Sequence, residues 1–183
     1  MDTMAPLTYS LCHKPVLGLL MFVASACAFP PLVSDAPFPL QQEGASAARE
    51  FEAPVSKPYS LLLSFSFPSA AASYRDEVVG SRSDESCGRA YDTISTSQRT
   101  GLGRPIPIHV LIRERATGSI KVDRVVNTLC LSSSGGPGFQ KNRTAARIEL
   151  AAGKYLVELR NMESQAGLDG VKTTFSIVSG GGK

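Results

Sequence analysis

The sequence has 183 residues, of which 43% are hydrophobic and 19% charged, so it is long enough to bury the core of one domain. It contains no Trp and 7% aromatic residues, beside 16 Gly and 12 Pro, which argues against long helices and against a sugar-binding platform built on indoles. The formal net charge of +3 is far from the concentrated basic surface that nucleic acids require, so nucleic acid is not expected as a partner.

An apolar segment near the N-terminus predicts export. Residues 16–26 (VLGLLMFVASA) carry no charge, follow Lys14, and are stopped by Pro30 and Pro31. A membrane-spanning helix needs about 20 apolar residues, so this segment is too short for one. We therefore predict a signal peptide over residues 1–26 and a periplasmic or outer-membrane-anchored location.

Two processing routes fit the residues that follow. Ala24-Ser25-Ala26-Cys27 resembles a bacterial lipobox, in which the Cys is acylated, and acyl chains on Cys27 would hold the protein to a bilayer. Cleavage by an ordinary signal peptidase after Ala26 or Ala28 also satisfies the A-x-A rule. We favour lipidation of Cys27, and expect membrane contact only through such an N-terminal lipid anchor.

Two further cysteines, Cys87 and Cys130, belong to the folded part of the chain. Disulfides persist in an oxidising compartment, so a Cys87–Cys130 bridge is one interpretation. The other is a buried thiol at Cys130 and a free thiol at Cys87. Neither has a second Cys or a His at the usual ligand spacing, and no metal or other cofactor is expected.

The mature chain divides into three parts by composition. Residues 27–37 contain three prolines and are predicted to be a tether, residues 38–179 a β-sandwich domain, and residues 180–183 a disordered tail. The first strands are expected at 49–52 and 59–67. In the second strand, alternation with period two places four large residues on one face: Leu61, Leu63, Phe65 and Phe67.

The stretch 69–104 gives the least regular pattern of the domain, being rich in Ser, Gly and charge. Stretches of this length without elements of their own are uncommon in compact domains. We expect a long loop with a short helix around residues 74–79, and we regard it as the first place to look for a binding site.

Alternation returns at residue 106 and continues to the end of the domain. Pro107 indicates that this strand starts there or lies at a sheet edge, and a turn at 116–118 makes 106–131 a hairpin. Its inward face is expected to hold Ile106, Ile108, Val110 and Ile112. Later strands are expected over residues 147–150, 154–160 and 171–178.

Seven or eight short strands and frequent turns predict an all-β fold, an antiparallel β-sandwich of immunoglobulin-like or jelly-roll-like type. Tyr155 follows a turn at residues 151–153 and begins a strand, which is typical of a tyrosine corner, where the ring packs inward and the hydroxyl bonds to nearby backbone.

Four segments, taken in order and spacing, resemble a bacterial family known as domain of unknown function 5625. They are FEAPV (51–55) ahead of YSL (59–61), PIPIHV (105–110), IELAAGKYLV (148–157), and LDGV (168–171) ahead of FSI (175–177). The resemblance covers residues 38–177 and implies an exported β-sandwich, often a lipoprotein, with no catalytic residues to transfer. The family usually passes from a helical segment straight into the Pro-Ile-Pro strand, whereas this chain has the Ser/Gly-rich stretch around Cys87.

Chemistry-bearing residues are few. His109 is the one histidine after the signal peptide, and no G-x-S-x-G nucleophile context accompanies it, so we expect a surface or half-buried side chain rather than a general base. Asp84, Glu85 and Asp92 do not have the spacing of a calcium loop. Arg113, Arg115 and Arg124 are expected either to converge across the 106–131 hairpin or to be solvated edge charges.

These observations lead to a non-enzymatic hypothesis. We expect an exported envelope protein that binds another envelope or secreted protein through its edge strands and the 69–104 loop, in its sharpest form an immunity-type lipoprotein that neutralises a periplasmic effector. The alternative is a periplasmic β-sandwich that binds a small ligand or a glycan on one sheet face. An enzyme that uses His109 ranks third.

Overall fold

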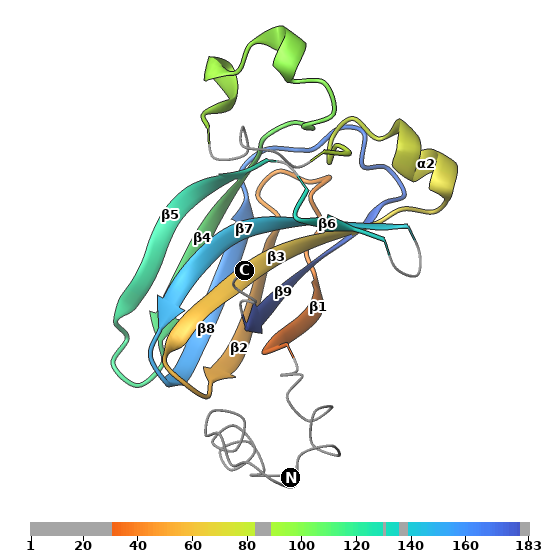
Figure 1. Cartoon of the computed structure of the whole chain (residues 1–183). Helices are drawn as coiled ribbons and strands as arrows, with labels where there is room; N and C mark the ends of the chain where they lie inside the picture. Colours follow the sequence, from red (N-terminus) through yellow and green to blue (C-terminus); the bar gives the residue numbers. More distant parts are fainter. Residues whose placement is uncertain (1–30, 83–88, 130, 136–138, 180–183) are drawn as a thin grey trace, which may run out of the picture.

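The computed structural model describes residues 31–82, 89–129, 131–135 and 139–179, which form two stacked antiparallel sheets (Figure 1). One sheet has the strand order β1-β9-β3-β7-β6 and the other β2-β8-β4-β5. The strands are β1 (Val33–Pro37), β2 (Ser46–Ala53), β3 (Lys57–Ser66), β4 (Ile106–Glu114), β5 (Ile120–Thr128), β6 (Ser133–Ser134), β7 (Gln140–Leu150), β8 (Gly153–Asn161) and β9 (Lys172–Ser179). The predicted antiparallel β-sandwich is confirmed, with nine strands in the described residues where seven or eight were expected.

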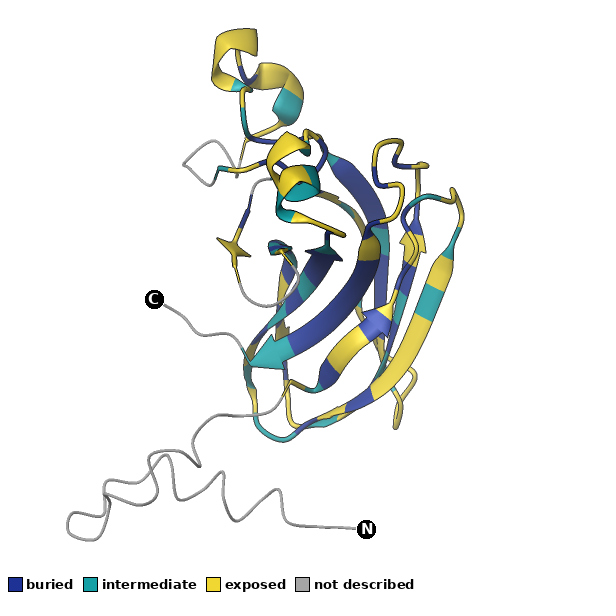
Figure 2. Ribbon diagram, turned by 90° about the vertical axis from the view of Figure 1, so that its right-hand side faces the viewer, coloured by how far each residue is buried: buried dark blue, intermediate teal, exposed yellow. Residues whose placement is uncertain are grey.

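The core lies between the two sheets, and Figure 2 shows the buried residues gathered along the facing strands. The alternating residues that were expected to face inward are buried. These are Leu61, Leu63, Phe65 and Phe67 around β3, Ile106, Ile108, Val110 and Ile112 on β4, and Tyr155 on β8, where Val157 and Leu159 are buried on the same face. Hydrophobic side chains alternate in this way because one face of each strand packs against the opposite sheet and the other faces away.

The prediction of a tether as far as residue 37 is wrong for its last five residues. Val33–Pro37 form β1, which pairs with β9 and buries Val33 and Ala36. Prolines do not prevent this, because Pro30 and Pro31 precede the strand, Pro37 is its last residue, and an edge strand has one side without a partner. The ladder bulges between Val33 and Ala36, where Asp35 has a φ of +43°.

The described part of the 69–104 stretch contains three short helices rather than one. Ser69 starts α2 (Ala70–Arg75) by accepting a hydrogen bond on Oγ from the Ala72 amide at 3.1 Å. The helix therefore begins and ends four residues earlier than the expected 74–79. Two single turns follow, η3 (Tyr91–Thr93) and η4 (Thr96–Gln98). None of the described helices has the length and apolar character needed to cross a membrane.

The three arginines of the 106–131 hairpin do not converge. Arg124 lies opposite Val110, a residue that faces the core, whereas Arg113 lies on the other face of the same sheet, opposite Leu156. Arg115, just after β4, pairs at 3.2 Å with Glu50 of β2, which lies on the far side of β8. Strand partners share a face, so an odd-numbered and an even-numbered arginine in this register point in opposite directions.

Candidate functional site

The irregular segments of the domain gather at one end of the sandwich, at the top of Figure 1. We call this region the loop end and define it as residues 69–82, 89–105, 131–135 and 139–141. It holds α2, η3 and η4, the short strand β6 and the first residues of β7. Loops carried on a rigid scaffold are where binding residues concentrate, so this end is the candidate site.

A buried arginine holds the loop end to the sheet beneath it. The Arg143 side chain of β7 is 0% exposed, and its guanidinium donates to the carbonyl oxygens of Val78, Val79, Arg104 and Thr128 at distances from 2.6 to 3.2 Å. Burial lowers the pKa of Arg143 to about 10, against the opposing effect of the Asp76 charge. The guanidinium is therefore still charged at neutral pH. It joins two segments of the loop end, at Val78–Val79 and at Arg104, to β7 and to the end of β5.

A buried ion pair lies beside this arginine. The Lys141 amine is 2.8 Å from Asp76 Oδ2, with 6% and 2% of the two side chains exposed. The Asp76 carboxylate also accepts the backbone amides of Val78, Val79 and Gly80. These bonds occupy the carboxylate and turn the chain sharply after α2, because a short acidic side chain can bond the amides that follow it.

Two glycines permit the close packing of residues 78–80 against residues 101–103, beside Arg143. A Cβ at Gly103 would overlap the Arg143 guanidinium and would lie 2.5 Å from the Val78 carbonyl oxygen. A Cβ at Gly80 would lie 2.6 Å from the Gly103 nitrogen. Both residues have positive φ, of +80° and +83°, which glycine adopts without steric penalty.

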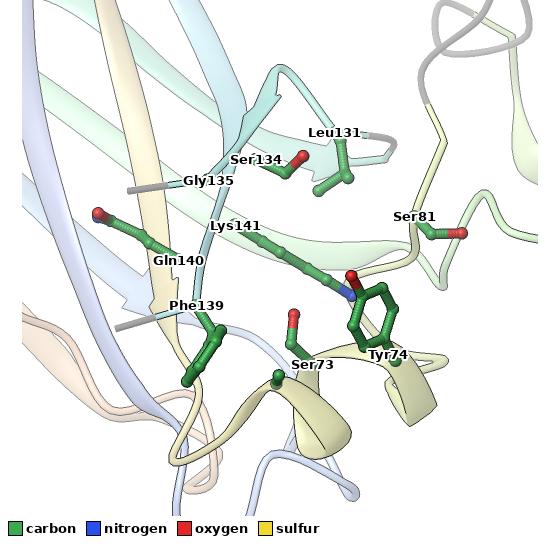
Figure 3. A pocket seen from close by; sticks show the side chains of 10 residues that line it. Ser73, Tyr74, Ser81, Leu131, Ser134, Gly135, Phe139, Gln140 and Lys141 are labelled. Atoms are coloured by element: carbon green, nitrogen blue, oxygen red, sulfur yellow. The ribbon is translucent and has the colours of Figure 1, made fainter. Parts of the chain in front are cut away.

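A cavity of about 320 Å³ opens between α2 and the start of β7 (Figure 3). Figure 3 shows the Lys141 side chain crossing from β7 toward α2, with Tyr74 on one side of the cavity and Phe139 on another. Tyr74 is 89% exposed and Phe139 47%. Phe139 has a φ of +50°, which is uncommon for a bulky side chain and fixes its direction at the rim.

A larger open groove, of about 860 Å³, lies on the other side of Tyr74. Three arginines line it: Arg75 from the end of α2, Arg99 after η4, and Arg104 before β4. The groove and the cavity share Tyr74 and Ser81, so the two hollows adjoin on one face of the loop end.

His109 has a partner that the sequence analysis did not identify. Its Nε2 is 2.7 Å from Asp123 Oδ1, with 33% and 52% of the two side chains exposed. The hairpin register places Asp123 diagonally across from His109, which pairs directly with Val125, and this register was the signal that could have revealed the contact. No hydroxyl or thiol of the described residues bonds to His109, so among these residues the contact is a surface hydrogen bond between His109 and Asp123 without an adjoining nucleophile.

The remaining predicted positions have separate outcomes. Cys27, Cys87 and Cys130 lie outside the described residues, as do Asp84 and Glu85. Over the described ranges, no group of three His, Cys, Asp or Glu side chains gathers in a metal-binding arrangement. The expected binding loop does contribute to the loop end, but the arginine groove and the rim residue Phe139 were not anticipated.

Comparison with known proteins gives a family and a fold. No curated protein matches the sequence. A crystal structure of a protein from Sulfurospirillum deleyianum superposes with a TM-score of 0.63 at 20% sequence identity, covering 84% of this chain and 100% of that one, which shows a shared fold. The family described as "Domain of unknown function (DUF5625)" matches residues 35–179. The chain therefore belongs to the DUF5625 family, as the sequence resemblance indicated.

Proposed function

We propose that this protein is a non-enzymatic, exported envelope protein that binds another protein through its loop end. The observation that supports this most directly is the pair of exposed aromatic side chains, Tyr74 and Phe139, beside a cavity of about 320 Å³. Aromatic residues are enriched at the energetic centre of protein interfaces, where a partner side chain fills an adjacent pocket.

The buried polar side chains next to these aromatic residues also support the proposal. Lys141, Arg143 and Asp76 fix the backbone of the loop end by hydrogen bonds within the interior. A site that is rigid before binding loses less conformational entropy when the partner arrives. In its sharpest form, the proposal is that the partner is a secreted effector that the protein neutralises, as immunity-type lipoproteins do.

The test is site-specific photo-crosslinking in the source organism. A photoreactive phenylalanine analogue is placed at Phe139, and at Val125 as the control, because the two residues are similarly exposed, 47% and 51%, while Val125 lies on the edge strand β5. We expect a discrete protein adduct at position 139 and none at 125. Adducts at neither position, or equally at both, would contradict the proposal.

The immunity form of the proposal has its own experiment. Deletion of the gene is expected to make cells sensitive to a periplasmic effector, and restored expression should protect them. Unchanged sensitivity to effectors encoded near the gene, together with a discrete adduct at position 139, would leave protein binding in place and remove the immunity role.

Export and lipidation belong to the same proposal. We expect radiolabelled palmitate to be incorporated into the wild-type protein and not into the Cys27→Ser variant. Recovery of the full-length chain from the cytosol, with residues 1–26 still attached, would contradict export. A mature protein cut after Ala26 or Ala28 without label would favour the ordinary signal peptidase.

A small-ligand function is the second candidate, and the same cavity supports it. Its volume of about 320 Å³ lies at the lower end of the range for small-molecule pockets, and its lining includes Ser73, Ser134 and Gln140, which can hydrogen-bond a sugar or a similar compound. A thermal-shift screen with glycans and metabolites should then give hits that the Tyr74→Ala variant loses. A screen without hits would count against it.

A further inference from the structure

The arginine groove offers more positive charge than the rest of the loop end neutralises. Arg75, Arg99 and Arg104 come from three separate stretches of chain and line one hollow of about 860 Å³. No ion pair among the described residues involves any of these three arginines. Their charge is therefore not taken up by a carboxylate of the described chain.

Two of the three guanidiniums are held in place by neutral partners. Arg99 Nε donates to the Ile94 carbonyl at 2.8 Å, and the guanidinium lies 4.6 Å from the centre of the Tyr91 ring. Arg104 Nη2 donates to the Ala166 carbonyl at 2.6 Å. A guanidinium has five N–H donors, so these contacts position it and leave further donors for a ligand.

The acidic residues of the groove do not balance this charge. The Asp76 carboxylate is already bonded to Lys141 and to three backbone amides, with 2% of its side chain exposed. Glu77 is exposed at the rim. Among the described residues that line the groove, three positive side chains thus face one available carboxylate, and Thr96 and Thr100 are further polar lining residues.

We propose that the groove binds an acidic segment of the partner protein, with Asp or Glu carboxylates accepting hydrogen bonds from Arg75, Arg99 and Arg104. This inference rests on the proposed protein-binding function and specifies the chemistry of the partner. Arginine suits the task because its planar fork bonds a carboxylate through two parallel N–H groups. Adjacent Tyr74 lies between the groove and the aromatic cavity, so one partner can occupy both hollows.

The first test uses a fluorescein-labelled octa-glutamate peptide as the acidic probe and an octa-glutamine peptide as the neutral one. We expect saturable anisotropy with the glutamate peptide, no binding of the glutamine peptide, and weakening when NaCl rises from about 50 to about 300 mM, since salt screens exposed charges. The Arg75→Glu variant should bind at least about tenfold more weakly, because it replaces attraction by repulsion.

The control for this variant is Arg113→Glu, which makes the same change of net charge at an exposed arginine on the outer face of the β2-β8-β4-β5 sheet. We expect its affinity to change by less than about twofold. Arg75 is exposed, and its side chain makes no hydrogen bond or ion pair with the residues that the structure describes, so Arg75→Glu should keep the wild-type melting temperature. A second variant, Arg99→Gln with Arg104→Gln, should also lose the probe. Equal losses in variant and control, or no loss in Arg75→Glu, would overturn the inference.

The crosslinking assay separates this inference from the proposed function. If the adduct at position 139 forms with equal yield in wild type and Arg75→Glu, the protein has a partner but the groove does not bind it. If no adduct forms at all, the proposed function fails, whatever the peptide titration shows.

Discussion

Arg143 is buried against backbone carbonyls, and no carboxylate of the described residues forms an ion pair with it. Its five hydrogen bonds join residues 78–79, 104 and 128, which belong to three different segments of the chain. A buried charge of this kind stabilises a fold only while every donor and acceptor around it remains paired. Each substitution at this point therefore acts on several segments at once.

Replacing Arg143 by Met should lower the free energy of unfolding by about 3 kcal/mol or more, because four carbonyl oxygens each lose a charged donor in a largely buried place. Urea denaturation measures the loss. Arg147→Met on the same strand is the control, since Arg147 is exposed and should change stability by less than about 0.5 kcal/mol. Similar losses for the two variants would show that Arg143 does not hold the loop end.

Gly103→Ala tests the close packing above that arginine. Its Cβ would overlap the Arg143 guanidinium and crowd the Val78 carbonyl, so we expect a loss of about 2 kcal/mol or more. Gly118→Ala has a similar φ of +70° with no atom within 4 Å, and should lose about 1 kcal/mol from backbone strain alone. Equal melting temperatures for the two variants would contradict the packing argument.

Glu114 offers a pH-dependent test. The Thr117 hydroxyl, and after it the Lys121 amine, hold the pKa of Glu114 below its ordinary value. A lowered pKa in the folded state means that ionised Glu114 adds stability above its ordinary pKa, and that this stability is lost as the pH falls through the lowered value. Thr117→Val should raise the pKa of Glu114 toward its ordinary value in an NMR titration of the carboxyl carbon. Thr100→Val should leave it unchanged.

The burial of Arg143 could not be anticipated from alternation, and one residue explains why. In the β3–β7 ladder, Leu61 pairs with Ala146 and Leu62 pairs with Thr144, so Ala145 is an extra residue that reverses the faces of the strand. Ile148 and Leu150 point inward with even numbers, whereas Lys141 and Arg143 point inward with odd ones. Without the bulge, both cations would face outward.

At the scale of elements, two tyrosines fix the entry of strands into opposite sheets in the same way. The Tyr155 hydroxyl donates to the Ala151 carbonyl at 3.0 Å, and the Tyr59 hydroxyl donates to the Val55 carbonyl at 2.8 Å. Each bond spans four residues and ties a fully buried ring to the turn before its strand. The sequence predicted the corner at Tyr155 from the preceding turn, but not the corner at Tyr59, where Pro58 stands immediately before the tyrosine.

Tyr155→Phe should lower the free energy of unfolding by about 1 kcal/mol, since the ring still fills the core but the Ala151 carbonyl loses its donor. Tyr74→Phe is the control, because Tyr74 is 89% exposed, and its stability should be unchanged. The two melting temperatures, measured side by side, decide the matter. A Tyr155→Phe protein as stable as the control would mean that the corner bond contributes nothing.

The strands whose residues alternate were predictable from the sequence, whereas β1, β6 and the loop end were not, for a physical reason. A strand such as β4 repeats one environment every second residue, so Ile106, Ile108 and Ile112 disclose its inner face. The loop end depends on contacts between residues far apart in the sequence, such as Arg104 with Ala166. Contacts of this kind produce no periodic pattern in the sequence. Composition predicted an irregular stretch at 69–104, whereas the arrangement of Arg75, Arg99 and Arg104 around one groove depends on how the chain folds.

At the scale of the whole molecule, the boundary of the domain lies earlier than composition indicated. β1 covers the edge of β9 and contributes the buried residues Val33 and Ala36, so the folded unit starts before residue 38. A protein that starts at residue 31 should unfold in one transition. A protein that starts at residue 38 should be less stable by about 2 kcal/mol, the value of one buried valine with its neighbours, in a urea titration. Equal urea midpoints for the two proteins would show that residues 33–37 add no stability and act as part of the tether.

The position of Arg143 along the chain has a consequence for the order of assembly. Its partners at Val78 and Val79 precede it by 65 and 64 residues. A chain released from a ribosome or a translocation channel begins with its amino end, so these partners emerge long before the guanidinium that fastens them. Val78, Val79 and Arg104 can then be fixed by Arg143 only after β7 has emerged, so the loop end is among the last parts of the domain to reach its final packing.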